Sequence, residues 1–150
     1  MKLNTLKGCL VEHAKQGHFD LILHGQNCKH GWKKGIAKKI ALHFPEAKKA
    51  DLMTKHGDKK KLGTYSQANI IIQDKPLTVI NCYTQFNYGQ GKHFNETAFR
   101  KCLRLINDEF AGKTVGYPKI GAGLAGGDWL TISAIIDEEL TNIDHQLVVL

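Results

Sequence analysis

Short apolar runs alternate along this chain with amphipathic stretches of helical period, and this pattern narrows the choice of folds more than any other feature. The runs typical of buried strands are residues 18–25, 114–118 and 145–150. The stretches with apolar side chains three or four positions apart are residues 35–44, 96–110 and 128–140. Strands that alternate with helices favour an α/β fold with helices on both faces of a sheet. We therefore expect a three-layer α/β/α fold.

The middle of the chain adds an antiparallel component. Residues 68–83 predict two strands around a tight turn at Asp74–Pro76, because proline is favoured inside turns. This hairpin predicts that the central sheet is mixed. Pro45 interrupts the first helical stretch, and residues 46–57 predict a further short helix.

Size and composition are those of an ordinary globular domain. The chain has 150 residues, 42% of them hydrophobic and 23% charged, and we expect one domain over residues 1–150. No apolar run approaches the roughly 18 residues that a membrane span requires, and the first residues lack a signal-peptide pattern. The four cysteines form neither a CxxC pair nor metal-ligand spacing. We therefore expect a cytoplasmic protein with reduced thiols, no membrane contact, no metal and no cofactor.

Positive charge is concentrated in one segment. Residues 29–61 contain eleven lysines but three acids, whereas the whole chain has a net charge of +7. This segment is either a solvated helical face or a surface that attracts a phosphate-bearing ligand. Nucleic acid is the less favoured partner, because only Trp32 and Phe44 interleave aromatic rings with these lysines.

Two glycine-bearing loops suit a phosphate. Residues 24–35 and 119–128 each follow an expected strand and precede an expected helix, which is where α/β sheets place ligands. Glycine lets the backbone approach a ligand closely, and the N-terminus of the following helix favours negative charge. Neither loop has the pattern of a P-loop or of a dinucleotide-binding G-x-G-x-x-G motif.

The segments "HGQNCKHGWKKGIAKKI", "YTQFNYG" and "PKIGAGLAGGDW", in this order and spacing, resemble those of macro domains. The similarity spans most of the chain and is greatest to the small branch that processes ADP-ribose-1″-phosphate, often carried by phages or bacteria. It implies a mixed sheet between helices, with ADP-ribose lying across the strand ends. It also implies hydrolysis of the terminal phosphate of ADP-ribose-1″-phosphate.

The resemblance also implies ligand contacts. Asn27 matches the asparagine that contacts the distal ribose. Cys9 and Leu10 stand where macro domains usually have an aspartate, which holds the adenine amino group, and an aliphatic residue. Contacts to the diphosphate and distal ribose are implied for Lys33, Lys34, Gly35, Ile120, Gly121, Ala122, Gly123 and Leu124. Lys33 stands where related sequences usually have glycine or another small residue, and Lys33 and Lys34 either meet an additional phosphate or crowd the loop.

Three residues are candidates for chemistry or for contact with the ligand. Asp128 either caps the helix that follows it or activates a water molecule. His30 either has a structural role or donates a proton and holds a phosphate. Tyr83 either flanks the adenine or ribose or packs in the core.

Two departures from the related hydrolases bear on the reaction. Gln85 and Ala125 stand where those that cleave ADP-ribosyl-glutamate have a lysine and an acid, so that reaction is not expected. The leading hypothesis is therefore a macro domain that binds ADP-ribose or a phosphorylated relative and removes a terminal phosphate. Three alternatives stay open: a non-catalytic binder of ADP-ribose or a related nucleotide signal, a nucleic-acid binder, and another ADP-ribosyl hydrolase. No protein partner can be inferred.

Overall fold

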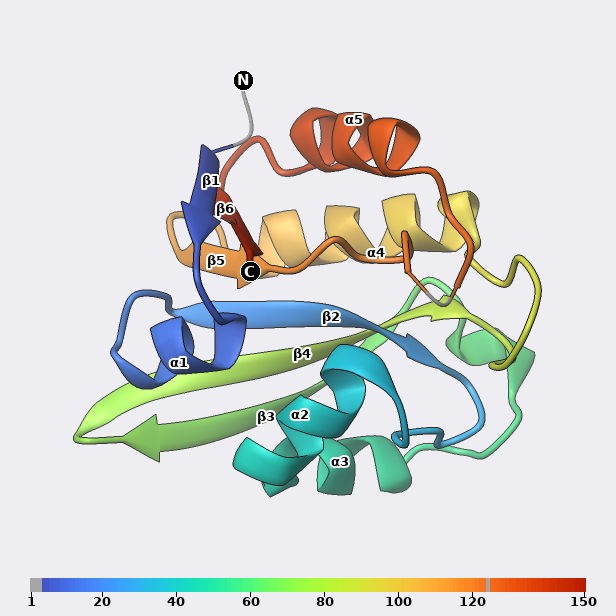
Figure 1. The fold of residues 1–150 in the computed structure, drawn as a ribbon, viewed down its shortest axis with the longest axis horizontal. Coiled ribbons are helices and arrows are strands. Elements are labelled where there is room, and N and C mark those ends of the chain that lie inside the picture. Colours follow the sequence, from blue (N-terminus) through green and yellow to red (C-terminus); the bar gives the residue numbers. More distant parts are fainter. Residues whose placement is uncertain (1–3, 124) are drawn as a thin grey trace.

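A six-stranded sheet lies between two layers of helices (Figure 1). The computed structural model describes residues 4–123 and 125–150. The strands are β1 (Asn4–Lys7), β2 (Leu21–Asn27), β3 (Tyr65–Ile72), β4 (Lys75–Gln85), β5 (Thr114–Tyr117) and β6 (Asp144–Val149). The α-helices are α1 (Leu10–Lys15), α2 (Gly35–His43), α3 (Pro45–Leu52), α4 (Glu96–Glu109) and α5 (Trp129–Glu139), and residues Lys59–Lys61 form a short 3₁₀ helix.

The strand order in the sheet is β1-β6-β5-β2-β4-β3. Every neighbouring pair is parallel except β3 and β4, which form an antiparallel hairpin at one edge. The mixed sheet expected from the sequence is therefore confirmed. Because the parallel strands end at the same edge, the segments that follow β1, β2, β4 and β5 emerge close to one another.

Helices cover both faces of the sheet, as the alternating pattern predicts. α4 and α5 pack on one face, and α1, α2 and α3 pack on the other (Figure 1). The apolar stripe of α4, with Phe99, Leu103 and Ile106, is fully buried, as is most of the stripe of α5. None of the helices in the described ranges combines the length and apolarity needed to cross a bilayer.

The structure corrects one expectation about proline and confirms another. The hairpin turns at Gln73 and Asp74, both with positive φ (50° and 67°), whereas Pro76 lies within β4 and pairs with Ile71. The nitrogen of Thr78, also in β4, points toward β2 and donates to Asp20 O, just before that strand begins. The nitrogen of Pro76 faces the same side but lies before β2 begins, so its missing N–H costs no ladder bond. The interruption expected at Pro45 is confirmed, since α2 ends at His43 and Pro45 begins the short helix α3 as its first residue, where no N–H is needed.

Candidate functional site

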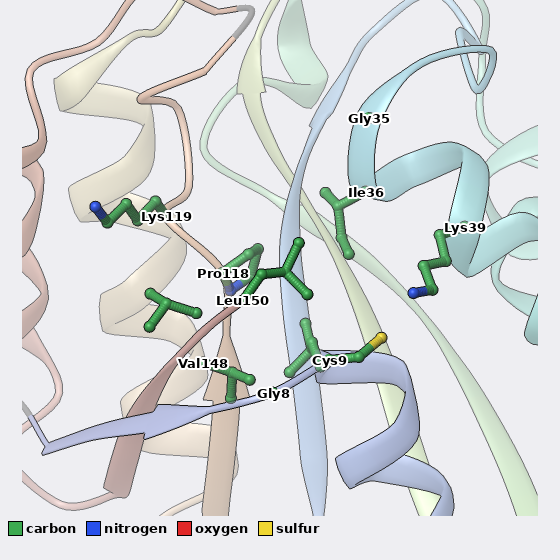
Figure 2. Close-up of a pocket in the computed structure, with 11 residues that line it drawn as sticks. Gly8, Cys9, Gly35, Ile36, Lys39, Pro118, Lys119, Val148 and Leu150 are labelled. Carbon is green, nitrogen blue, oxygen red and sulfur yellow. The ribbon is translucent and has the colours of Figure 1, made fainter.

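Two adjacent cavities lie at the carboxyl ends of the parallel strands. The first, of about 700 Å³, is called here the lysine-lined cavity and is bounded by the segment after β2, the start of α2 and the loops after β4 and β5. The second, of about 630 Å³, is called the Cys9 cavity and is bounded by the β1–α1 junction, α2 and the end of β6 (Figure 2). Both are lined by Gly35 and Ile36, so the N-terminus of α2 lies where they meet.

The N-terminus of α2 is suited to bind an anion. Lys34 is its N-cap residue, and no side chain caps the first amides of the helix. Gly35 has a φ of +61°, a conformation that glycine adopts without strain. The backbone therefore turns so that uncapped N–H groups begin the helix between the two cavities, and the helix dipole adds to their attraction for negative charge.

Side chains from β2 hold the loop over the lysine-lined cavity. The Asn27 carboxamide oxygen accepts hydrogen bonds from the N–H groups of Lys29 (2.9 Å) and Gly31 (3.0 Å). The Gly31 carbonyl in turn accepts from Asn27 Nδ2 (3.1 Å) and from Gln26 Nε2 (2.9 Å). Asn27 lines the cavity, as the sequence predicts, and it also shapes the loop from within.

His30 lines the same cavity and has a positive φ of 56°. Its Nε2 lies 3.0 Å from the carbonyl oxygen of Thr54, so this nitrogen carries the proton and donates. The ring also packs edge-on against His56, with centroids 5.3 Å apart. In the described part of the chain no third metal-ligating side chain joins this pair.

Lysines surround the lysine-lined cavity on several sides. Lys29, Lys33 and Lys34 come from the loop after β2, and Lys48 comes from α3. No Asp or Glu is found among the described residues that line the cavity. The sequence singles out Lys33 and Lys34 only; Lys48 belongs to another helix, and no local pattern indicates that it faces the same space.

The glycine-rich loop after β5 closes the lysine-lined cavity from the other side. Gly121, with a φ of +72°, and Gly123 line the cavity. A Cβ on Gly121 would overlap the ring of Phe94, so this close packing requires glycine, whereas Gly123 has open space around it. The Gly121 carbonyl accepts a hydrogen bond from Gly127 N at 2.6 Å, which folds the loop back on itself. Leu124 lies outside the described residues.

A buried carboxylate lies beneath the loop over the lysine-lined cavity. Asp51, on α3, is fully buried; its Oδ2 accepts from Trp32 Nε1 (2.7 Å) and its Oδ1 accepts from Tyr83 OH (2.6 Å). Lys61, itself 8% exposed, lies over the Tyr83 ring at 4.9 Å and donates to Thr54 Oγ1 at 2.9 Å. The network joins the cavity-lining Trp32 to α3 and β4.

Several sequence candidates lie away from the lysine-lined cavity. Tyr83 is buried against Asp51, and burial raises the pKa of its hydroxyl well above the ordinary value. Ile120 and Ala122 pack against the core under α4 and α5. Asp128 is exposed, occupies the N-cap position of α5 without capping it, and accepts a hydrogen bond from Thr131 Oγ1 at 2.9 Å.

The Cys9 cavity has mainly apolar walls, and Lys39 and Lys119 are the charged side chains among the described residues that line it. The side chain of Lys39 extends from α2 toward Cys9 at the start of α1 (Figure 2). Burial acts to raise the pKa of the Cys9 thiol, but hydrogen bonds from Lys39 and from the backbone N–H groups of Glu12 and Val11 outweigh it, so the pKa is lowered. Leu10, the second residue predicted here, lines the cavity and is buried.

The fold matches that of known macrodomains. The macrodomain of Thermus aquaticus DarG superposes over 98% of this chain and 97% of its own, with a TM-score of 0.75 and 16% identity. Thermosipho africanus DarTG, solved in complex with ADP-ribose, gives a TM-score of 0.74 and 16% identity over 99% of this chain and 42% of its own. A Bacteroides thetaiotaomicron protein of unknown function has a TM-score of 0.81 and 24% identity over 100% and 99% of the two chains. This chain therefore has the macrodomain fold.

A sequence relative is found in a bacteriophage. An uncharacterized 17.5 kDa protein from the tk-vs intergenic region of Enterobacteria phage T4 is 32% identical over 153 residues, which cover 99% of this chain and 96% of the phage protein. The chain belongs to the family of this phage protein. No family model matches this chain.

The buried Asp51 network generates a prediction for stability. An Asp51→Asn variant keeps one acceptor oxygen and loses the charge, so Trp32 and Tyr83 can no longer both donate to residue 51, and Tyr83 must donate to Ser66 Oγ, 2.8 Å away, instead. The loss of one buried charge-assisted hydrogen bond is expected to lower the free energy of unfolding by about 2–3 kcal/mol. Asp74→Asn is the matched control, because Asp74 is exposed and its left-handed conformation suits asparagine. Urea unfolding of both variants is the measurement, and equal stability of the two would contradict a structural role for the carboxylate.

The contact between Lys39 and Cys9 predicts which thiol reacts first. A lowered pKa increases the thiolate fraction at neutral pH, and Cys9 is partly exposed while the other three cysteines are buried. We expect iodoacetamide at pH 7 to modify Cys9 fastest, as followed by mass spectrometry. Lys39→Met should shift the rate profile of Cys9 to higher pH, whereas Lys38→Met, on the exposed neighbouring position, should not. Unchanged kinetics in Lys39→Met would show that the ammonium does not act on the thiol.

Proposed function

We propose that the two cavities together bind ADP-ribose or a phosphorylated derivative and that the protein removes a terminal phosphate from the bound nucleotide. The base would occupy the Cys9 cavity, the diphosphate the N-terminus of α2, and the distal ribose the lysine-lined cavity. The observation that carries this proposal is the lysine-lined cavity itself, where Lys29, Lys33, Lys34 and Lys48 gather beside an uncapped helix N-terminus.

The amount of positive charge favours a ligand with more than a diphosphate. The diphosphate of ADP-ribose carries about two negative charges, and a terminal phosphate monoester adds about 1.5 to 2 more. Four lysines and the field of α2 exceed what the diphosphate alone would balance. A phosphate at the distal end of the ligand would account for the remainder. The ADP-ribose complex of DarTG, which has the same fold, supports the choice of nucleotide.

The proposed reaction is hydrolysis of a phosphate monoester. A water molecule attacks phosphorus, the bond between phosphorus and the oxygen on C1″ breaks, and ADP-ribose and inorganic phosphate are released. Lysines and backbone N–H groups stabilise the charge that develops on the phosphoryl oxygens. His30, which lines the lysine-lined cavity, is assigned to donate a proton to the leaving oxygen from Nδ1 of its imidazolium form, because its Nε2 already donates to the Thr54 carbonyl. Water activation by Asp128 remains a prediction, since this exposed carboxylate is not among the residues that line the cavity.

One observation favours a second function, binding without turnover. The described residues that line the lysine-lined cavity include no carboxylate that could act as a base on water. A protein that only recognises ADP-ribose or a related nucleotide signal would need no such group. Binding and turnover must therefore be measured separately.

The binding experiment is calorimetric titration with ADP-ribose. We expect Gly123→Glu to weaken binding more than about tenfold, because it adds a side chain and a negative charge to the open space at Gly123. Gly123→Ala separates bulk from charge and should bind within about twofold of the parent protein. Ala134→Glu adds the same charge on the exposed face of α5 and should bind normally. No binding by the parent protein would contradict the proposed site.

The turnover experiment is phosphate release from ADP-ribose-1″-phosphate. We expect His30→Gln to lower kcat at least about a hundredfold while ADP-ribose affinity is retained, because only the transition state needs the proton. Asp128→Asn tests the predicted base in the same assay. Normal ADP-ribose binding with no phosphate release by the parent protein would leave the non-catalytic binder as the function.

A further inference from the structure

The Cys9 cavity offers mainly apolar surface to a ligand. Its walls come from separate elements: Leu10 from α1, Ile36 from α2, Pro118 after β5, and Val148 from β6 (Figure 2). These side chains are apolar and suit the faces of a planar group better than its polar edge. A base placed here would gain stabilisation from its faces, but the apolar walls cannot distinguish one purine from another.

Discrimination must come from the polar edge of this cavity. The side chain of Lys39 points into the Cys9 cavity beside Cys9 (Figure 2). An ammonium offers three hydrogen-bond donors and no acceptor, and a thiol is a weak acceptor at best. Interactions with Lys39 and with the backbone N–H groups of Glu12 and Val11 lower the pKa of the Cys9 thiol, so the surroundings of the sulfur favour negative charge. No Asp or Glu is present among the described residues that line this cavity.

This edge therefore matches a hydrogen-bond acceptor on the ligand. Lys39, which lies beside Cys9 in the wall of this cavity, can direct an N–H to the base. An exocyclic amino group at the edge would place donor against donor, with a partial positive charge facing the ammonium. A carbonyl oxygen in the same position would accept a charge-assisted hydrogen bond, which is among the stronger types in proteins.

We propose that Lys39 and Cys9 select a nucleotide whose base turns a carbonyl oxygen toward them, so that a 6-oxopurine is preferred over the 6-aminopurine of ADP-ribose. The inference rests on the proposed function, since it assumes that the two cavities together bind a nucleoside diphosphate ribose. It makes Lys39 the specificity-determining residue of the Cys9 cavity. It assigns the 6-oxopurine analogue of ADP-ribose, inosine diphosphate ribose, as the tighter ligand.

Calorimetric titration with ADP-ribose and with inosine diphosphate ribose tests the inference, because the two ligands differ only at the base. We expect the parent protein to bind the inosine ligand about tenfold more tightly, the value of one additional charge-assisted hydrogen bond. Lys39→Met should remove most of this preference by weakening the inosine ligand about tenfold, while ADP-ribose stays within about twofold.

Two further variants sharpen the test. Cys9→Asp supplies an acceptor at the same edge, and aspartate is favoured at the N-cap position that Cys9 occupies, so the variant should fold and shift the preference toward ADP-ribose. Lys119→Met is the matched control: Lys119 also lines the Cys9 cavity but extends away from Cys9 (Figure 2), and its loss should leave the ratio of the two affinities unchanged.

The outcomes separate this inference from the proposed function. Binding of both ligands with equal affinity, or tighter binding of ADP-ribose by the parent protein, would overturn the inference and leave the proposed nucleotide site intact. An equal loss for both ligands in Lys39→Met would also overturn it, because Lys39 would then attract the phosphates rather than select the base. Binding of neither ligand would overturn the proposed function itself.

Discussion

The buried carboxylate of Asp51 has a decisive effect on the site. A carboxylate removed from water must be hydrogen-bonded, and here its two oxygens are satisfied by an indole N–H from the loop after β2 and a phenol from β4. Those bonds hold the side chain of Trp32, a residue of this loop, against α3 and β4. On the strand side, Asn27 and Gln26 hold the same loop through their hydrogen bonds to Gly31. The wall of the lysine-lined cavity is therefore held in place before any ligand arrives, which lowers the ordering cost of binding.

The sequence predicted the layers of the fold well because periodicity reports burial directly. The apolar faces of α2, α4 and α5 all pack against the sheet as expected. The helix α1 was not predicted, since its six residues are too few to display a helical period. The hairpin was predicted at the right place, but the turn was expected at residues 74–76 and lies at residues 73–74, one to two positions earlier. Proline misled the prediction because it is compatible with the start of a hairpin strand as well as with a turn.

For the candidate site, sequence reasoning succeeded with groups that lie next to one another in the chain. Asn27, Lys34 and Gly121 all line the lysine-lined cavity, because Asn27 ends β2 and the other two follow strands that end at the same edge. It could not place Lys48 there or Lys39 beside Cys9, since both contacts join elements that only the packed fold brings together. Tyr83 lies in a strand where side chains alternate between two faces. Its partner Asp51 lies 32 positions away, so no local pattern indicated that its hydroxyl is buried.

The four lysines of the lysine-lined cavity differ from the rest of the site in how they are held. Lys33, Lys34 and Lys48 are exposed and Lys29 is half-buried, whereas the groups that shape the loop, such as Asn27 and Gln26, are buried. Because the lysines carry little of the packing, each can be exchanged without disturbing the sheet or the glycine loop. Relatives could thus retune the same framework to ligands of different charge by changing one surface position at a time, and the recognition of anions can drift faster than the fold that supports it.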